Sequence, residues 1–366
     1  MDTSDSRLSF DHDGVCDHCR HFDKYTRPNW HPDADGRREL EAIAASIRRR
    51  GVRAEYDSIL GLSGGVDSSY MLHILVAELG LRPLVFHVDA GWNSEVAVHN
   101  IEVLVNKMGL DLFTEVIDWE EMRDFQLAFF KSGMPGIDIP QDHAFVAVLY
   151  KFAERYGIKH IWNGGNVATE AIRNPLEWIY YGTDLRLIKD VHRQFGTVPL
   201  RRYPLSRVLR HKVYLRYIRG VKVIKALNYI PYNKEVAKAT LARDYGWKPY
   251  ARKHDESRFT KFYEGFWLPE RFGYDTRKVQ FSSLILTGQM TREQALEELK
   301  KPSYDPATID DDFRYIATKL GISTDELWSY FRMPKKTYRD YKNEEWLFNL
   351  GARFLRAVGV EKSIKR

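Results

Sequence analysis

Apolar and polar positions alternate along the first half of the chain with two different periods. Short apolar runs have the length of buried strands, whereas longer stretches repeat an apolar residue every three or four positions. The predicted strands are 58–62, 83–90, 112–117 and 160–166, and the predicted helices are 37–50, 70–77, 95–108, 119–131 and 142–156. Strands and helices that alternate at these lengths favour an α/β fold with a doubly wound parallel sheet.

Near residue 175 the pattern changes to longer helical stretches that are dense in aromatic and basic residues. Further helices are predicted at 292–301, 323–333 and 343–358. Because 366 residues exceed one ordinary core, more than one domain is expected. We predict a small Cys-containing N-terminal segment (1–35), an α/β domain (36–175) and a mainly helical substrate or partner domain (176–366).

A glycine-rich turn follows the first predicted strand and leads directly into a helix. Its sequence is Ser63-Gly64-Gly65-Val66-Asp67-Ser68. The glycines let the backbone approach a ligand closely, and the N–H groups and dipole of a helix N-terminus attract anions. Asp67 would repel a phosphate unless Mg²⁺ bridges the two, which is the donor set that Mg²⁺ favours. The turn therefore predicts a phosphate site with Asp67 as magnesium ligand.

The spacing of this turn excludes two common nucleotide loops. It has neither the G-x-x-x-x-G-K-[ST] pattern of the Walker A loop nor the G-x-G-x-x-G pattern of dinucleotide-binding folds. A glycine turn without any ligand is the alternative interpretation.

Other candidate site residues stand where the second and fourth predicted strands end. Asp89 ends the second strand, and the turn Gly164-Gly165-Asn166 ends the fourth. Ligands of open α/β sheets bind at the carboxyl ends of the strands, so these residues are expected beside the ligand. Glu170 is a candidate second metal ligand, a base for ammonium, or simply a helix cap. His254 is a candidate ligand or acid–base group, with a structural histidine as the alternative.

Composition limits the class of protein. Hydrophobic residues make up 44% and charged residues 29%, and we find no apolar run of about 18 residues that would span a membrane. The N-terminus is polar and acidic, unlike a signal peptide. Two cysteines form no disulfide framework in a chain of this size, so a cytoplasmic location is expected.

Positive charge is concentrated in one stretch. The chain has a net charge of +6, and residues 201–225 contain nine Lys or Arg and no acidic residue. Val, Leu, Ile and Tyr are interleaved with these charges. The stretch is interpreted either as a solvated helix face or as a contact with a membrane surface or polyanion.

The two cysteines are spaced as Cys16-x-x-Cys19, which supplies half of a structural zinc site. Nearby histidines could complete it, and two reduced thiols are the alternative.

The turn resembles the SGGxDS loop of the ATP pyrophosphatases, which hold the pyrophosphate of ATP while a substrate oxygen attacks the α-phosphate. Four further segments carry a closer resemblance, to the N-acetyl sugar amidotransferases of bacterial surface-polysaccharide synthesis. These segments are 8–19, 163–170, 254–263 and 283–299. The resemblance implies an adenine-nucleotide alpha-hydrolase-like fold, with 36–175 as the ATP pyrophosphatase domain, and a role in lipopolysaccharide O-antigen synthesis.

The family is an AMP- and diphosphate-forming C–N ligase. It activates an acetamido group of a nucleotide-linked sugar with ATP, and ammonia then gives an acetamidino group. Ammonia comes from a separate glutaminase and its cyclase-like companion. The resemblance thus implies ATP, Mg²⁺ and these proteins as partners, with no stable nucleic acid and with peripheral membrane contact as a further candidate.

The resemblance also suggests residue roles. Ser63, Asp67 and Glu170 are the expected catalytic residues, and Ser63–Ser68 would hold the pyrophosphate. Asp89 and the turn 164–166 would flank the adenosine. Family members commonly carry another C-x-x-C upstream, and this sequence starts just inside that position. Zinc at Cys16 and Cys19 therefore stays an open expectation.

A nucleotide-linked sugar, often a uronate in this family, brings a diphosphate and a carboxylate, which Arg and Lys recognise. The expected substrate-binding residues are Arg258, Lys261, Arg277 and Lys278. Each alone could be an ordinary surface charge.

Three other functions stay open from the residues. One is a tRNA-modifying enzyme that adenylates a tRNA base with the same loop, which the basic stretch favours. The others are an ammonia-dependent amide synthetase acting on a small molecule and a non-catalytic nucleotide-binding scaffold. No cysteine follows Cys19, which argues against persulfide chemistry.

Overall fold

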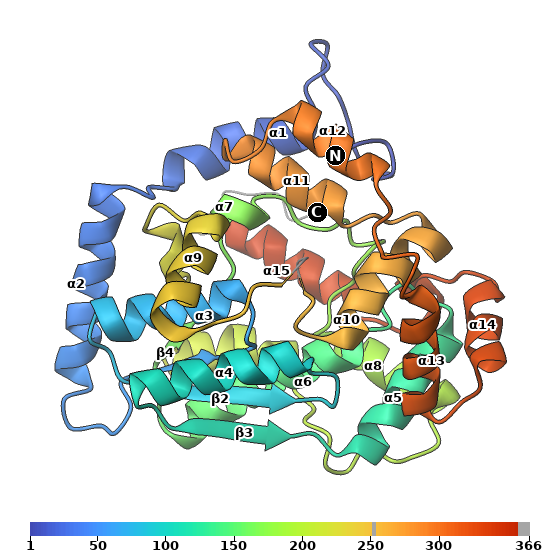
Figure 1. Ribbon diagram of the computed structural model, residues 1–366, viewed down its shortest axis with the longest axis horizontal. Helices are drawn as coiled ribbons and strands as arrows, with labels where there is room; N and C mark the ends of the chain where they lie inside the picture. Colours follow the sequence, from blue (N-terminus) through green and yellow to red (C-terminus); the bar gives the residue numbers. More distant parts are fainter. Residues whose placement is uncertain (251–253, 358–366) are drawn as a thin grey trace.

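A five-stranded, fully parallel sheet forms the centre of the molecule, in the order β3-β2-β1-β4-β5 (Figure 1). The computed structural model describes residues 1–250 and 254–357. The strands are β1 (Ser58–Gly61), β2 (Pro83–Asp89), β3 (Leu112–Val116), β4 (His160–Trp162) and β5 (Lys222–Ile224). The predicted α/β class with a parallel sheet is confirmed.

Strand β1 is central because its side chains are apolar on both faces. Ile59 and Leu60 are fully buried, and Leu60 is in register with Val85 of β2 and with Trp162 of β4. The chain passes from β1 to β2 and β3 on one side and returns to β4 on the other. The connections diverge between β1 and β4, the position at which ligands bind in open α/β sheets.

Helices cover both faces of the sheet and continue into the C-terminal half. The first eight α-helices are α1 (Asp17–His21), α2 (Ala34–Arg50), α3 (Val66–His73), α4 (Glu95–Met108), α5 (Trp119–Ser132), α6 (Ile139–Arg155), α7 (Val167–Glu170) and α8 (Leu185–Phe195). The others are α9 (Lys234–Tyr245), α10 (Arg258–Phe262), α11 (Arg277–Leu286), α12 (Arg292–Lys300), α13 (Ile309–Leu320), α14 (Thr324–Arg332) and α15 (Glu345–Ala357).

Shorter segments extend or connect these helices. The π-helical ones are Phe22–Thr26, Ile74–Glu78, Arg210–Ile218 and Tyr263–Phe272, and the 3₁₀ segments are Arg27–Asn29, Ala226–Asn228 and Tyr338–Asp340. Local signals set many helix ends: Asp33, Ser94 and Asp118 cap N-termini with their side chains. Gly109 and Gly133 end α4 and α5 in the left-handed conformation.

The basic stretch 201–225 combines a helical segment that is largely exposed with a strand that was not predicted. It contains the π-helical segment Arg210–Ile218 and then β5, which pairs with β4 at the edge of the sheet. The strand was not predicted because Lys-Val-Ile is short and follows a basic, helix-like run. The predicted domain boundary near residue 175 stays a prediction, although β5 lies beyond it in sequence and inside the sheet in space.

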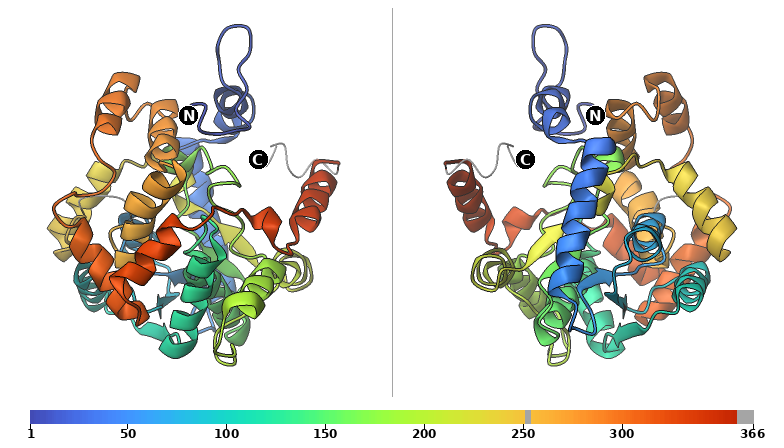
Figure 2. Two further views of the ribbon diagram at one scale, coloured as in Figure 1. Left: turned by 90° about the vertical axis from the view of Figure 1, so that its right-hand side faces the viewer. Right: turned by 90° about the vertical axis from the view of Figure 1, so that its left-hand side faces the viewer.

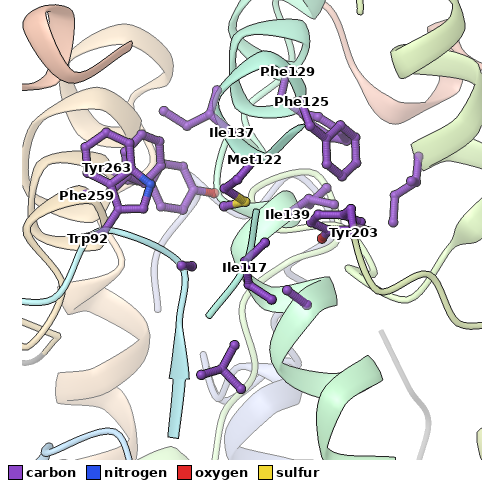
Figure 3. Close-up of a cluster of buried hydrophobic side chains, with 14 of the residues drawn as sticks. Trp92, Ile117, Met122, Phe125, Phe129, Ile137, Ile139, Tyr203, Phe259 and Tyr263 are labelled. Carbon is purple, nitrogen blue, oxygen red and sulfur yellow. The ribbon is translucent and has the colours of Figure 1, made fainter. Parts of the chain in front are cut away.

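One aromatic core joins the sheet to the C-terminal half (Figure 3). Phe130 of α5 packs edge-on against Trp267 and Phe259, with ring centroids 4.8 Å and 5.9 Å away. Trp92, just past β2, lies 4.9 Å from the Phe259 ring and donates its indole N–H to Gln126. Most of the C-terminal half therefore packs directly onto the α/β layer.

Helix α15 stands off the main body on the side where α8 lies (Figure 2). The residues just before it are held by hydrogen bonds: the backbone N–H groups of Lys342 and Glu344 donate to Asp190 and Asp184. Trp346, Leu350 and Phe354 are exposed along one face of the helix. Within residues 1–250 and 254–357, no helix is long and apolar enough to cross a bilayer.

A substitution that leaves a cavity in the aromatic core between the two halves should destabilise the whole protein. Phe130→Ala removes a fully buried ring, which typically costs about 3–5 kcal/mol. The midpoint of chemical denaturation, followed by circular dichroism, measures the change. Phe354→Ala is the matched control: that ring is 64% exposed, and its removal should change stability by less than about 0.5 kcal/mol. Equal shifts for both variants would contradict the assignment of Phe130 to the joining core.

Candidate functional site

The turn Ser63–Ser68 connects β1 to α3, and Gly64 fixes its shape. Gly64 has φ +81°, and a Cβ at this position would lie 2.7 Å from the carbonyl oxygen of Ala97 in α4. The Gly64 carbonyl accepts hydrogen bonds from the indole of Trp247 and the hydroxyl of Tyr250, both at 3.1 Å. Glycine is required here for its conformation and for the close approach to α4.

The serine hydroxyls hold the turn together from inside. The two hydroxyl oxygens of Ser63 and Ser68 are 3.1 Å apart, and Gly65 N–H donates to Ser63 Oγ at 3.3 Å. Helix α3 begins immediately afterwards without a side-chain cap at Gly65. Because the first N–H groups of a helix have no acceptor within it, they remain available to an anion. The geometry therefore suits a phosphate.

Asp67 lies in the first turn of α3 and has two partners that the sequence did not suggest. The hydroxyl of Tyr232 donates to one carboxylate oxygen, and the ammonium of Lys234 lies 3.4 Å from the other. Burial, and then the negative charge of Asp67, raise the pKa of Tyr232, so its hydroxyl stays protonated as a donor. Both partners precede or begin α9, and only folding brings them to the turn.

A cavity of about 780 Å³ opens in front of the turn. Its walls come from the turn, from α9 and from the C-terminal half. Lining residues predicted from the sequence are Ser63, Gly65, Val66, Asp67, Ser68, Gly164, Glu170, His254, Lys261 and Arg277. Lys234, Lys238 and Glu256 also line it and were not predicted. A carboxylate oxygen of Glu256 would lie only 2.8 Å from a Cβ at Gly65, so it borders the turn directly.

The second glycine turn meets the first, as expected from the topology. A Cβ at Gly164 would lie 3.5 Å from the backbone nitrogen of Ser68. Gly165 N–H is held by the Asn163 side chain at 2.9 Å. Asn166 is buried and caps α7 by accepting from Thr169 N–H at 2.9 Å, so its side chain serves the helix.

Asp89 shapes the turn after β2. Its carboxylate accepts from Gly91 N–H at 2.8 Å and from the Asn93 amide at 3.2 Å. Asn93 also contacts Nε2 of His87, whose pKa is lowered by burial. In this arrangement Asp89 stabilises the loop that precedes α4, and its predicted contact with adenosine stays a prediction.

The four predicted substrate-binding cations each have a carboxylate partner already. Arg258 and Lys261 share Asp312, at 3.4 Å and 2.8 Å, and the Arg258 guanidinium lies 3.5 Å from the centre of the Tyr315 ring. The other two predicted cations, Arg277 and Lys278, form ion pairs with Asp275 and Asp2 at 2.7 Å and 2.8 Å. Lys261 and Arg277 line the cavity, whereas Lys278 ties down the N-terminal segment.

Cys16 and Cys19 lie together in the N-terminal segment, with their sulfur atoms 3.4 Å apart. The hydrogen bond from the Cys19 thiol lowers the pKa of Cys16. The neighbouring His18 is paired with Asp5 at 2.9 Å. In the described ranges no three His, Cys, Asp or Glu side chains gather as a metal site, so the two cysteines supply two ligands at most and zinc stays a prediction.

His254 adopts a left-handed backbone conformation with φ +66°, which is uncommon for a residue other than glycine. Its Nδ1 atom is 3.0 Å from the Glu264 carboxylate. His254 lines the cavity, and the Glu264 carboxylate is its neighbour there.

Comparison with known proteins finds a similarity in the C-terminal part. Residues 256–355 match the family described as LPS biosynthesis protein WbpG-like, C-terminal domain. This region is therefore similar to that family, and we call it the WbpG-like domain. The matched region starts at Glu256, which borders the turn Ser63–Ser68 (the phosphate-type turn). It includes Lys261 and Arg277, which line the cavity. The chain thus combines a region similar to the WbpG-like family with the turn Ser63–Ser68, whose sequence has the SGGxDS pattern. The family description agrees with the predicted relationship to lipopolysaccharide synthesis.

Two relatives extend the match beyond the WbpG-like domain. An uncharacterized protein of Methanocaldococcus jannaschii, MJ1599, is 23% identical over 87% of this chain and 97% of its own length. The glutamine-hydrolyzing GMP synthase of Thermosipho africanus is 32% identical over 117 residues. That match covers 29% of this chain and 21% of the synthase.

Solved structures give weaker similarities. The NMN synthetase of Francisella tularensis has a TM-score of 0.30 and 13% identity, covering 71% of this chain and 94% of that one. The NH3-dependent NAD synthetase of Campylobacter jejuni has a TM-score of 0.32 and 14% identity, covering 82% and 98%. At such scores the fold assignment rests on the strand order and the turn of this chain.

The effect of the close contact between Gly64 and Ala97 can be measured separately from the effect of the positive φ angle of Gly64. Gly64→Ala and Gly157→Ala both place a side chain at positive φ, which costs about 1–2 kcal/mol. A Cβ at Gly157 meets nothing within 4 Å, whereas at Gly64 it collides with Ala97. We expect ATP affinity, measured by calorimetry, to fall at least about 10-fold for Gly64→Ala alone. Unchanged affinity in Gly64→Ala would contradict a nucleotide site at the turn.

Proposed function

We propose that this protein is an ATP-dependent amidotransferase. It converts an acetamido group of a nucleotide-linked sugar to an acetamidino group and releases AMP and diphosphate. One observation carries the proposal: residues of the WbpG-like domain and the phosphate-type turn line the same cavity. A domain of lipopolysaccharide synthesis therefore faces the place where ATP would bind. The predicted cytoplasmic location is part of this proposal.

The first step activates the amide. The acetamido oxygen attacks the α-phosphorus of ATP, an O–P bond forms, and the bond between the α-phosphorus and the bridging oxygen breaks, so that diphosphate leaves. The N–H groups of α3 and the hydroxyls of Ser63 and Ser68 would hold the departing diphosphate. Lys234 and Lys238 line the same cavity and add positive charge there.

The residues also fit Mg²⁺, which needs few protein ligands beside phosphate oxygens. Asp67 would hold the ion, and a bound ion would neutralise charge on the phosphates. Tyr232 and Lys234 fix the orientation of the Asp67 carboxylate. Because a carboxylate with two donors is pre-positioned, it needs little rearrangement on binding.

The second step replaces oxygen by nitrogen. Ammonia forms a C–N bond to the activated carbon, the C–O bond breaks, and AMP leaves with the oxygen, taking up one proton from the ammonia. Glu170 lines the cavity and is the candidate base for incoming ammonium. We propose that a separate glutaminase and its cyclase-like companion supply the ammonia.

The reaction can be tested directly. Purified protein is incubated with ATP, ammonium and UDP-linked diacetamido sugars. Mass spectrometry should show AMP and a sugar nucleotide in which NH replaces O. Asp67→Asn should reduce kcat/KM by about 100-fold or more, because charge that develops on the phosphates loses its stabilisation. The exposed Asp35→Asn serves as a control with unchanged activity.

Two results would contradict the amidotransferase proposal. Release of ADP instead of AMP would exclude attack at the α-phosphorus. AMP release that requires tRNA and ignores sugar nucleotides would favour the alternative, adenylation of a tRNA base.

We also propose a peripheral contact between the basic stretch and an anionic membrane. Leu209, Tyr217 and Ile218 are 51%, 60% and 71% exposed in and beside the segment Arg210–Ile218, among exposed arginines. Exposed apolar and basic side chains together are typical of membrane-surface helices. This segment lies on the protein surface, apart from the residues that line the cavity.

Vesicle sedimentation tests the membrane contact. Binding to vesicles with phosphatidylglycerol should exceed binding to neutral phosphatidylcholine and should weaken with salt. Arg216→Glu with Arg219→Glu should abolish the difference. The same charge change in α12, Arg292→Glu with Lys300→Glu, should leave it intact. Equal loss in both pairs would indicate a general charge effect and contradict a specific surface.

A further inference from the structure

A second cavity, of about 460 Å³, adjoins the first. The two cavities have several lining residues in common. The shared residues are Glu170, His254, Glu264, Thr276 and Gln280. A ligand in the second cavity would therefore lie next to the cavity in front of the phosphate-type turn.

Two cations line this second cavity, Arg173 and Lys225. Desolvation by the surrounding protein lowers the pKa of Lys225; the charge of Arg173 lowers it further, and that of Glu170 opposes the shift. The two positive charges therefore act on each other across the cavity. Both cations line the second cavity, and the carboxylate that acts on Lys225 is Glu170, which lines both cavities.

Lys225 is placed by the glycine turn after β4. A Cβ at Gly165 would lie 3.4 Å from Lys225 Nζ and 3.5 Å from a carboxylate oxygen of Glu170. The neighbouring Gly164 contacts Ser68 of the phosphate-type turn. Two adjacent glycines thus bring the ammonium of Lys225 close to the turn where the α-phosphorus of ATP would react.

The remaining wall is partly aromatic. Leu176, Ile179, Tyr180 and Tyr181 line the second cavity. Tyr180 is fixed by a hydrogen bond from its hydroxyl to Asp184 at 2.8 Å, and Tyr181 stacks on Phe348 of α15 with ring centroids 4.1 Å apart. A pocket with apolar walls and a few charged groups is typical of a small-ligand site.

We propose that the second cavity binds the negatively charged end of the sugar acceptor, with Arg173 and Lys225 as its donors. This proposal rests on the proposed amidotransferase function. The anion is either a carboxylate on the sugar or the diphosphate of its nucleotide carrier, since both chemistries suit Arg and Lys. Binding there would direct the acetamido group toward the turn Ser63–Ser68.

Calorimetry without turnover tests the site. The probes are UDP, a UDP-linked acetamido sugar with a carboxylate, and the same sugar with a neutral hydroxymethyl group. Arg173→Gln and Lys225→Gln should each weaken binding of the carboxylate sugar at least about 10-fold, as expected for a lost charge-assisted hydrogen bond. ATP affinity should change less than about 2-fold.

The three probes distinguish the source of the charge. If the carboxylate is bound, the neutral sugar and UDP bind equally to the wild type and to the variants. If the diphosphate is bound, UDP itself binds more weakly to both variants. Lys222→Gln, on β5 just before Lys225 and outside the cavity, is the matched control, and Lys225→Arg should restore most of the affinity.

The results separate this proposal from the reaction itself. Normal amidination by the wild type, with sugar binding unchanged in the Arg173→Gln, Lys225→Gln double variant, would overturn the anion site and leave the function standing. Sugar binding that depends on both residues, without AMP release, would overturn the function and leave the site standing. Absence of any sugar-nucleotide binding by the wild type, or equal loss of ATP and sugar affinity, would overturn the anion site.

Discussion

The site depends on the fixed position of one peptide, at Gly64. Its carbonyl is held by Trp247 and Tyr250, and its Cα lies against Ala97 of α4. These contacts come from two different parts of the chain and leave the turn a single conformation. With the carbonyl held on one side, the N–H groups that follow at the start of α3 face the cavity, where an anion compensates them.

The candidate substrate-binding cations differ in their surroundings. Arg258, Lys261, Arg277 and Lys278 each satisfy a carboxylate, and Arg258 also covers the Tyr315 ring. These ion pairs hold the cations in place, and their role in substrate binding stays a prediction. Arg173 and Lys225 border the second cavity, where an incoming anion can compensate their positive charge.

The aromatic core explains how the two halves of the chain share one site. Phe130 and Trp92, from the α/β layer, pack against Phe259 and Trp267 of the WbpG-like domain. Because these rings are buried, the WbpG-like domain is held against the carboxyl end of the sheet. Glu256 and Lys261, at the start of that domain, consequently lie on the cavity wall beside the turn.

The sequence by itself determined the α/β class, the first four strands and the phosphate-type turn. These depend on local periodicity and on glycines whose backbone requirements can be read without knowing their neighbours. It did not reveal β5, the partners Tyr232 and Lys234 of Asp67, or the cavity position of Arg173 and Lys225. In β5 a strand of three residues is defined by its pairing with β4 and not by its own composition. Tyr232 is 165 residues from Asp67 in sequence, and whether a cation is paired depends on which carboxylate folding places beside it. Such contacts between distant segments are decided only by the tertiary structure, because no local pattern encodes them.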